Sequence, residues 1–217
     1  MEIIANNVKL NYEVFGEGTP IILLHGNGED LKIFDKLILK LKSKYKVYAI
    51  DSRCHGKSEK TKNISYELMC DDIIDFIKKL KIKKPILYGF SDGGIIGLLL
   101  AIKNSKILSK LIVSGANLEP KGFKLMMRLY TNIGYFITRG KLFKLMKDEP
   151  HIKVADLKKV SVPTVILAGE NDIVKLEHTK LICDNIKDSK LEIISKEDHC
   201  SYIVHSNKIY YILEKYL

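Results

Sequence analysis

Short apolar runs alternate along the chain with longer segments in which apolar residues recur every three or four positions. The short runs are bounded by turn residues and predict buried strands, whereas the longer segments predict helices. Because the short runs are apolar on both faces, we expect an α/β fold with a mainly parallel sheet covered by helices on both sides. The predicted central strands are Ile21–Leu24, Lys46–Ile50, Pro85–Tyr88, Lys110–Ser114, Thr164–Ala168 and Leu191–Ile194.

The remaining periodic segments add a hairpin and five helices. Glu2–Ile4 and Lys9–Phe15 flank the turn pair Asn6-Asn7 and predict an antiparallel hairpin before the first central strand. The helices are predicted near residues 31–42, 66–80, 94–104, 176–186 and 204–216. In the second of these, apolar residues share one face and charged residues the other.

The stretch from Glu119 to Leu157 breaks the alternation, because it is helical and apolar but has no obvious strand. It contains more apolar residues than one face of a surface helix buries, although a helix packed on the sheet is the alternative interpretation. We expect an inserted helical cap over approximately residues 119–157, in which methionines and aromatic rings line a substrate pocket. Met126 and Tyr130 are the predicted substrate-binding residues of this cap.

Length and composition indicate a single globular domain over residues 1–217. Apolar residues make up 46% and charged residues 29% of the chain, and no apolar run approaches the roughly 20 residues that cross a bilayer. The segment Met1–Ile4 lacks the features of a secretory signal, so we expect a cytoplasmic protein with no membrane partner. The four cysteines lack C-x-x-C spacing, which fits reduced thiols better than a disulfide framework or a zinc site.

The formal net charge of +10 comes almost entirely from lysine. Only Arg53, Arg128 and Arg139 are arginines, and arginine is the usual reader of phosphates and bases. The lysines are spread along the chain with acidic residues between them. We therefore expect a solvated lysine-rich surface and no specific nucleic-acid partner.

The candidate chemistry centres on Ser91. The segment Gly89–Gly93 has the G-x-S-x-G pattern of a nucleophile elbow, between an apolar strand and an apolar helix. The pattern needs glycines two residues to either side, because the serine has a strained backbone with φ above zero and because strand and helix nearly touch. Ser91 is therefore the candidate nucleophile, at a helix N-terminus.

A serine nucleophile needs a base within hydrogen-bond reach and an acid that orients the base. His199 follows the last predicted strand, where catalytic loops of open α/β sheets collect. Asp172 follows the strand Thr164–Ala168 and is the favoured acid. Glu170 in the same loop and Glu119 at the end of the preceding strand are the alternatives. His205 lies within the last predicted helix and is expected at the surface.

Acyl transfer also needs backbone N–H groups that stabilise an oxyanion. The candidates are Asp92, directly after the nucleophile, and Asn27, in the loop His25–Gly28. The Asp92 carboxylate has two interpretations. In the first, it binds a substrate ammonium, as in an aminoacyl ester. In the second, it stabilises the helix N-terminus by about 0.3–1 kcal/mol.

These motifs resemble the α/β-hydrolase superfamily over essentially the whole chain. The residues that carry the resemblance are His25–Gly28, residues 51–58, Gly89–Gly93, Val162 through Asp172, and His199. The resemblance implies an eight-strand-like sheet with serine, acid and histidine in that order. Residues 51–58 look like a D-x-R-G-x-G-x-S loop, a structural turn in the family, with Cys54 where glycine is commoner. The chain looks most similar to small bacterial single-chain hydrolases with a G-[FW]-S-D-G-G elbow, and its cap is short beside theirs.

The predicted function is a serine hydrolase that cleaves a small-molecule carboxylic ester through an acyl-enzyme on Ser91, with thioesters and amides less favoured. Dehalogenase or epoxide-hydrolase chemistry would require aspartate at position 91. Carbon–carbon bond hydrolysis and perhydrolysis use the same triad and are alternatives, as is a noncatalytic ligand sensor. We expect no metal or organic cofactor, and either a monomer or a homodimer that uses the exposed side of the cap.

Overall fold

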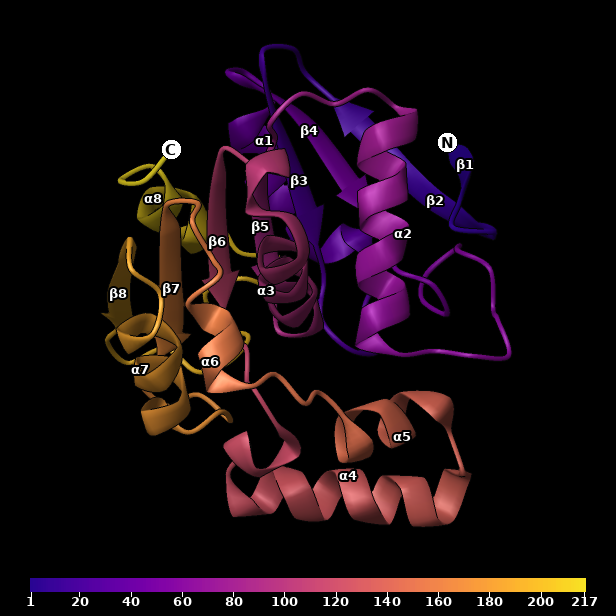
Figure 1. Ribbon diagram of the computed structural model, residues 1–217, viewed down its shortest axis with the longest axis vertical. Helices are drawn as coiled ribbons and strands as arrows, with labels where there is room; N and C mark the ends of the chain where they lie inside the picture. Colours follow the sequence, from indigo (N-terminus) through magenta and orange to yellow (C-terminus); the bar gives the residue numbers. More distant parts are fainter.

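An eight-stranded sheet forms the centre of the computed structural model, which describes residues 1–217 (Figure 1). The strand order is β1-β2-β4-β3-β5-β6-β7-β8. The β1–β2 and β2–β4 pairs are antiparallel, and every other pair is parallel. The strands are β1 Glu2–Ala5, β2 Val8–Phe15, β3 Thr19–Leu24, β4 Tyr45–Ile50, β5 Ile86–Phe90, β6 Lys110–Ser114, β7 Thr164–Gly169 and β8 Ser189–Ile194.

The predicted hairpin and all six predicted central strands are confirmed, and their ends agree within two residues. Asn6 and Asn7 have left-handed φ values of 48° and 58°, as the two central residues of a type I′ turn require. The strands β3 to β7 are buried along most of their length because each is covered on both faces, whereas β8, at the edge of the sheet, has no buried residue.

Helices cover both faces of the sheet (Figure 1). One core of 35 buried residues lies beneath four helices, and a second core of 21 buried residues lies on the opposite face beneath two. On the first face are α2 Tyr66–Lys79, α3 Asp92–Asn104, α6 Val154–Leu157 and α7 Leu176–Asp184, and on the second are α1 Asp35–Leu41 and α8 Lys208–Leu213. Because β4, β3, β5, β6, β7 and β8 run parallel, their carboxyl ends lie at one common edge of the sheet.

The last helix is shorter than the predicted 204–216, since α8 begins at Lys208 and ends at Leu213. The prediction that His205 lies inside that helix is wrong, because His205 has a φ of 49° and lies in the turn before α8. Its backbone N–H donates to the carbonyl of Ile33 at 2.8 Å. Its ring is exposed beside Asp35 at 3.1 Å, which confirms the predicted surface position.

A helical segment between β6 and β7 projects from the carboxyl edge of the sheet. It consists of a 3-10 turn at Pro120–Gly122, α4 Leu125–Thr138 and α5 Lys141–Asp148. In Figure 1, α4 forms the lower edge of the molecule, and α5 packs against it. The helix α6 also falls within the predicted cap range, but its Leu157 packs into the main core. The projecting part is thus the α4–α5 pair.

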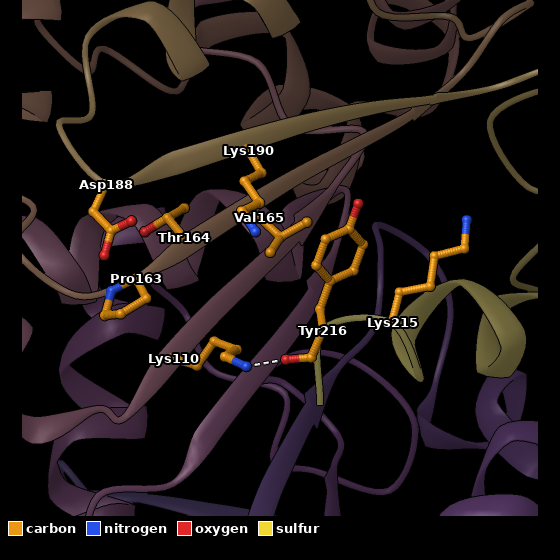
Figure 2. A pocket seen from close by; sticks show the side chains of 8 residues that line it. All are labelled: Lys110, Pro163, Thr164, Val165, Asp188, Lys190, Lys215 and Tyr216. Carbon is orange, nitrogen blue, oxygen red and sulfur yellow. Dashed lines mark hydrogen bonds between the residues drawn. The ribbon is translucent and has the colours of Figure 1, made fainter.

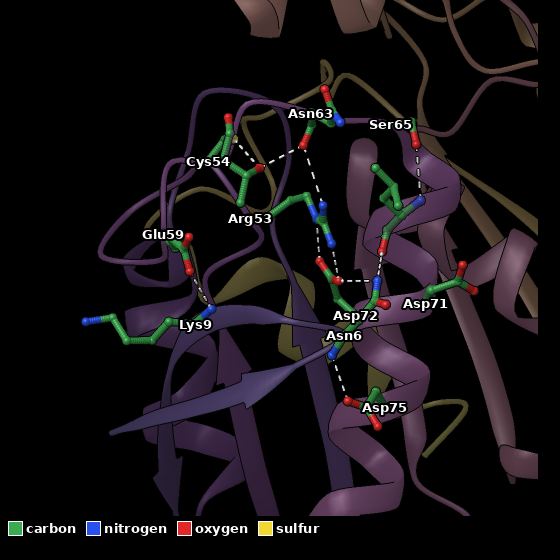
Figure 3. Close-up of polar contacts among 12 residues, drawn as sticks. Asn6, Lys9, Arg53, Cys54, Glu59, Asn63, Ser65, Asp71, Asp72 and Asp75 are labelled. Carbon is green, nitrogen blue, oxygen red and sulfur yellow. Dashed lines mark hydrogen bonds and ion pairs between the residues drawn. The ribbon is translucent and has the colours of Figure 1, made fainter.

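A buried ion pair fixes the loop between β4 and α2 (Figure 3). Arg53 donates to Asp72 through both Nε, at 2.6 Å, and a terminal guanidinium nitrogen. Asn6 in the hairpin turn donates from Nδ2 to the same carboxylate at 2.9 Å. These bonds join the first hairpin, the loop and α2. Arg53, one of the three arginines, is therefore buried.

Candidate active site

Ser91 lies at the turn between β5 and α3, at the carboxyl edge of the sheet. Its backbone has φ 52° and ψ −112°, which is strained for a residue with a side chain. A Cβ atom on Gly89 would lie 2.1 Å from the carbonyl oxygen of Gly93, and one on Gly93 would lie 2.2 Å from that of Leu24. Only glycine fits at either position, so the spacing of the elbow follows from the close approach of strand and helix.

The serine is the end of a chain of hydrogen bonds. His199 Nε2 lies 3.1 Å from Ser91 Oγ, and His199 Nδ1 lies 2.7 Å from Asp172 Oδ1. The same carboxylate oxygen accepts the backbone N–H of Val174 at 2.9 Å. The imidazole packs on Phe90 with ring centroids 4.8 Å apart. Because Asp172 and His199 are both buried, their geometry is fixed by protein contacts rather than by solvent.

Of the three carboxylates considered as the acid, only that of Asp172 is hydrogen-bonded to His199. Glu170 is exposed and accepts hydrogen bonds from the Lys196 backbone at 2.7 Å and from Ser195 Oγ at 3.1 Å. These bonds lower the pKa of Glu170, with the Lys196 N–H contributing most. Glu119 is the residue before the 3-10 turn at Pro120 and makes no bond to His199.

Two backbone N–H groups near Ser91 are free to bind an oxyanion. Asn27 and Asp92 take no part as donors in the turn and loop hydrogen bonds. Asp92 is the first residue of α3, so its N–H has no partner within the helix. The loop of Asn27 is tied to α3 by a bond from the Gly93 N–H to the His25 carbonyl at 3.1 Å.

The carboxylate of Asp92 is engaged by the protein itself. Its Oδ1 accepts a hydrogen bond from the Tyr66 hydroxyl at 2.6 Å, and its Oδ2 accepts one from Asn27 Nδ2 at 3.0 Å. Burial raises the pKa of Asp92, against the effect of these two hydrogen bonds. Asp92 is not among the residues that line the cavity at Ser91. Its position fits the alternative role at the helix N-terminus.

A cavity of about 150 Å³ opens over Ser91 and His199. The sheet side contributes the elbow, the base and the loop after β3, whereas the cap contributes three apolar side chains. The lining consists of Gly26, Asn27, Glu29, Phe90, Ser91, Phe123, Met127, Met146, Ile173, His199 and Cys200. The cavity is therefore mostly apolar with a few polar groups near the serine, as expected for a small-molecule site.

The two cap residues predicted to bind substrate lie elsewhere. Met126 and Tyr130 are exposed on α4 and do not line the cavity, and Tyr130 packs on Phe143 at 5.5 Å between ring centroids. Met127 lines the cavity instead, with Met146 from α5. Successive residues of a helix point about 100° apart, so a shift of one position moves a side chain from the cavity to the surface.

Glu29 is a cavity residue that the sequence analysis missed. Its Oε2 accepts the backbone N–H of Gly26 at 2.9 Å. A Cβ atom on Gly26 would lie 2.7 Å from this oxygen and 3.1 Å from Ser91 Cβ, so the two atoms are within about 6 Å of each other. Burial raises the pKa of Glu29. The only signal in the sequence is its place directly after the His25–Gly28 motif.

A larger cavity of about 250 Å³ lies at the opposite edge of the sheet (Figure 2). It is formed at the amino ends of β6, β7 and β8, and Lys110 donates there to the carbonyl of Tyr216. It contains none of the residues around Ser91. No group of three or more His, Cys, Asp or Glu side chains is arranged to hold a metal ion.

Comparison with known proteins identifies the family of the fold. The family described as alpha/beta hydrolase fold matches residues 19–130. The sn-1-specific diacylglycerol lipase ABHD11 of Danio rerio is 30% identical over 151 residues, which are 67% of this chain and 46% of that protein. The human serine hydrolase BPHL is 26% identical, over 100% of this chain and 85% of BPHL.

The fold is also that of solved hydrolases. The enol-lactonase from Burkholderia xenovorans LB400 superposes with a TM-score of 0.81 at 17% identity, over 99% of this chain and 97% of the lactonase. The chain spans less than half of the zebrafish lipase but most of human BPHL. Since the family match covers more than half of its residues and the sheet has the same architecture, the chain belongs to the α/β-hydrolase fold family.

Proposed function

We propose that this protein is a serine hydrolase that cleaves small-molecule carboxylic esters through an acyl-enzyme on Ser91. The observation that carries the proposal is the continuous hydrogen-bond chain from Ser91 through His199 to Asp172 at the wall of a cavity. A ligand sensor would not need a nucleophile, a base, an acid and two free N–H donors in this arrangement.

In the acylation step, His199 acts as general base. Its Nδ1–H donates to Asp172, which leaves Nε2 to accept the proton of Ser91 Oγ. The alkoxide attacks the acyl carbon, and the N–H groups of Asn27 and Asp92 stabilise the resulting oxyanion. Collapse of the tetrahedral intermediate breaks the ester C–O bond, and His199 Nε2–H protonates the departing alkoxide. Asp172 stabilises the imidazolium throughout.

Deacylation repeats the sequence with water in place of the serine. His199 removes a proton from water, and the hydroxide attacks the acyl carbon of the Ser91 ester. The same two N–H groups stabilise the second oxyanion. The C–O bond to Ser91 then breaks, the proton returns from His199 to the serine oxygen, and the carboxylic acid leaves.

The cavity favours a short acyl group. Its volume of about 150 Å³ is small beside the roughly 300–1,000 Å³ of sites that hold drug-sized ligands. Phe123, Met127 and Met146 provide apolar contacts for such a chain. We therefore expect activity to be highest on short aliphatic esters and to fall as the acyl chain outgrows the cavity.

The test is hydrolysis of p-nitrophenyl esters from acetate to octanoate by the wild type and by Ser91→Ala. We expect the variant to lose at least about a thousandfold in kcat, as loss of a serine nucleophile does in triad enzymes. Ser43→Ala, at an exposed site away from the cavity, is the matched control and retains full activity. A fluorophosphonate should add one mass label to the wild type and none to Ser91→Ala.

The outcomes separate the alternatives. Ester hydrolysis that survives in Ser91→Ala would overturn the assigned nucleophile. Labelling of Ser91 without turnover of any ester would keep the nucleophile but reject the ester substrate, in favour of a thioester, an amide or a carbon–carbon bond. Neither labelling nor turnover, in a folded protein, would favour the noncatalytic ligand sensor.

A further inference from the structure

One face of α4 is apolar and uncovered. Only Thr131 of this helix is buried, and Met127, Gly134 and Tyr135 are half-buried on the side that faces the rest of the protein. Seven of the twelve exposed large apolar side chains of the whole chain lie on α4. They form what we call the outer face of α4: Leu125, Met126, Leu129, Tyr130, Ile133, Phe136 and Ile137. Monomeric soluble proteins rarely leave an apolar surface of this kind without a partner.

The outer face is continuous. At 100° per residue, its seven side chains fall within one arc of about 140° around the helix axis. Phe136 and Ile137 are 74% and 72% exposed, and Met126 is 77% exposed. Only Tyr130, at one border of the arc, packs on another element, through Phe143 of α5. In Figure 1, α4 forms the lower edge of the molecule, with α5 on its other side. The helix is thus amphipathic with its apolar side directed outward.

The segment around α4 is predominantly basic, although Lys144 and Lys147 form ion pairs with Asp148 just beyond it. Residues 120–147 contain seven lysines and arginines and no aspartate or glutamate. All seven side chains are exposed: Lys121, Lys124, Arg128, Arg139, Lys141, Lys144 and Lys147. Acidic residues are common elsewhere in the chain, so this segment is more basic than the general lysine-rich surface.

We propose that the outer face of α4 binds the surface of an anionic lipid bilayer, with the helix lying in the plane of the membrane. Its apolar side chains enter the boundary between headgroups and acyl chains, and the basic residues contact the anionic headgroups. The helix lies on the bilayer and does not span it. Its 14 residues extend about 21 Å, against a hydrocarbon core of about 30 Å. No helix of the protein is both long and apolar enough for a membrane span.

This proposal departs from the sequence-based expectation of no membrane partner, which considered segments that cross a bilayer. A helix that lies on the surface needs only a short apolar arc and a basic border. Both features depend on which side of α4 faces outward, and this orientation comes from the structure.

A second copy of this chain is the other candidate occupant of the outer face. In a two-fold dimer the same surface faces itself, so each basic border would meet an identical basic border. Like charges brought together in this way disfavour association. An anionic lipid surface offers apolar contacts to the arc and negative charge to its cationic border, and it is the occupant that we infer.

The position of α4 relates membrane binding to the cavity. Met127 lines the cavity from the half-buried side of the same helix whose other side forms the outer face. The helix therefore lies between the proposed membrane surface and Ser91. Binding through the outer face needs no catalytic step, so it can be tested independently of the proposed hydrolase activity.

The test is co-sedimentation of the full chain with vesicles of phosphatidylcholine alone and of phosphatidylcholine mixed with phosphatidylglycerol. We expect binding to the mixed vesicles, weakened by added salt, and little binding to phosphatidylcholine. A Met126→Glu/Phe136→Glu variant should bind at least about tenfold more weakly. Leu39→Glu/Tyr211→Glu makes the same charge change at two exposed apolar residues on α1 and α8, and it should lose far less. Circular dichroism confirms that both variants are folded, and Ser91→Ala should bind as the wild type does.

Several results would overturn the proposal. One is absence of wild-type binding to the anionic vesicles, and another is equal loss of binding in the two double variants. A third is a dimer in sedimentation velocity that Met126→Glu/Phe136→Glu dissociates, which would assign the outer face to a second copy. Hydrolysis of soluble p-nitrophenyl esters by Met126→Glu/Phe136→Glu should equal that of the wild type, because neither residue lines the cavity.

Discussion

The side chain of Asn27 donates a hydrogen bond to the carboxylate of Asp92 at 3.0 Å. The backbone N–H groups of these same two residues are the proposed oxyanion donors. Asn27 lies in the loop after β3, and Asp92 begins α3, so the side-chain bond links the two segments that carry the donors. The Tyr66 hydroxyl holds the other oxygen of Asp92 at 2.6 Å and fixes the carboxylate from the opposite side.

Asn27→Ala tests this link, because it removes the side-chain bond but keeps the backbone N–H. We expect kcat for p-nitrophenyl esters to fall about tenfold, less than the roughly 10²–10³-fold cost of losing an oxyanion donor itself. The KM should change little, since the bond acts on the transition state. Asn104→Ala, at an exposed position at the end of α3, is the control. A raised KM with unchanged kcat would instead make Asn27 a substrate contact.

Glu29 should make the site selective against anionic substrates. No lysine or arginine lines the cavity, although the chain carries a net charge of +10. A carboxylate on the substrate about 6 Å from Glu29 would be repelled by about 3 kcal/mol at an effective dielectric constant of 20. Glu29→Gln should therefore raise kcat/KM for a carboxylate-bearing ester by at least about tenfold relative to its neutral analogue.

The control for this experiment is Glu170→Gln, because Glu170 is exposed and outside the cavity. Paired substrates, such as the p-nitrophenyl monoester of a short dicarboxylic acid and the matching aliphatic ester, give the ratio directly. An unchanged ratio in Glu29→Gln would show that the carboxylate does not act on the bound substrate.

His25 should make the fold sensitive to acid. Its Nδ1 lies 2.7 Å from the Gly26 carbonyl oxygen, and its Nε2 accepts the backbone N–H of Ser52 at 3.0 Å, an arrangement that only the neutral ring satisfies. Burial, reinforced by nearby His55, lowers the pKa of His25 to about 4 from 6.5. Between these values the unfolded chain binds a proton that the folded chain does not, so the free energy of unfolding decreases as pH falls.

Urea unfolding at a series of pH values measures this effect. Protonation of His25 should lower the free energy of unfolding by up to about 3 kcal/mol between about pH 6.5 and about pH 4. His25→Gln should be less stable at neutral pH but should show a flatter pH dependence, whereas His205→Gln, at the surface, should follow the wild type. A His25→Gln curve parallel to that of the wild type would assign the acid sensitivity to other groups.

The buried pair of Arg53 and Asp72 should be important for folding but not for chemistry. Arg53→Leu leaves the Asp72 carboxylate buried without its cation, which costs about 3–5 kcal/mol in proteins where such pairs have been broken. Urea unfolding should show a loss of that size, and Arg53→Leu/Asp72→Leu should recover much of it. Fluorophosphonate labelling of Ser91 should persist in the folded fraction of each variant. A loss of labelling in folded protein would contradict the structural role.

Much of the sheet could be predicted because its central strands are apolar on both faces, a pattern that few other elements share. The order of Ser91, Asp172 and His199 could be predicted because each follows a strand whose carboxyl end reaches the same edge. The pattern favoured Asp172 as the acid but left Glu170 and Glu119 open. The choice depends on how each loop turns: Glu170 points to Ser195 and Lys196 instead of His199.

The cap could not be oriented from the sequence because the apolar arc of α4 faces outward, whereas an amphipathic helix usually turns its apolar side toward the core. Met126 and Met127 have the same chemistry but point to different sides of the helix. The start of the last helix was also misjudged, since nothing in the apolar pattern shows that His205 takes a left-handed backbone. Glu29 was missed because a carboxylate in a loop is usually solvated, and only the fold brings it over Ser91.

The cap leaves the sheet and returns to it at one place. The backbone N–H of Ile152 donates to the carbonyl of Leu118 at 2.9 Å, while β6 and β7 pair directly, with Ser114 opposite Leu167. The residues between those two ends can therefore be lengthened, shortened or exchanged without moving either strand. The proposed nucleophile, acid and base are positioned by the sheet, whereas this one contiguous segment supplies Phe123, Met127 and Met146 to the cavity. Exchange of this segment alone should therefore change the apolar wall of the cavity and leave the sheet as it is.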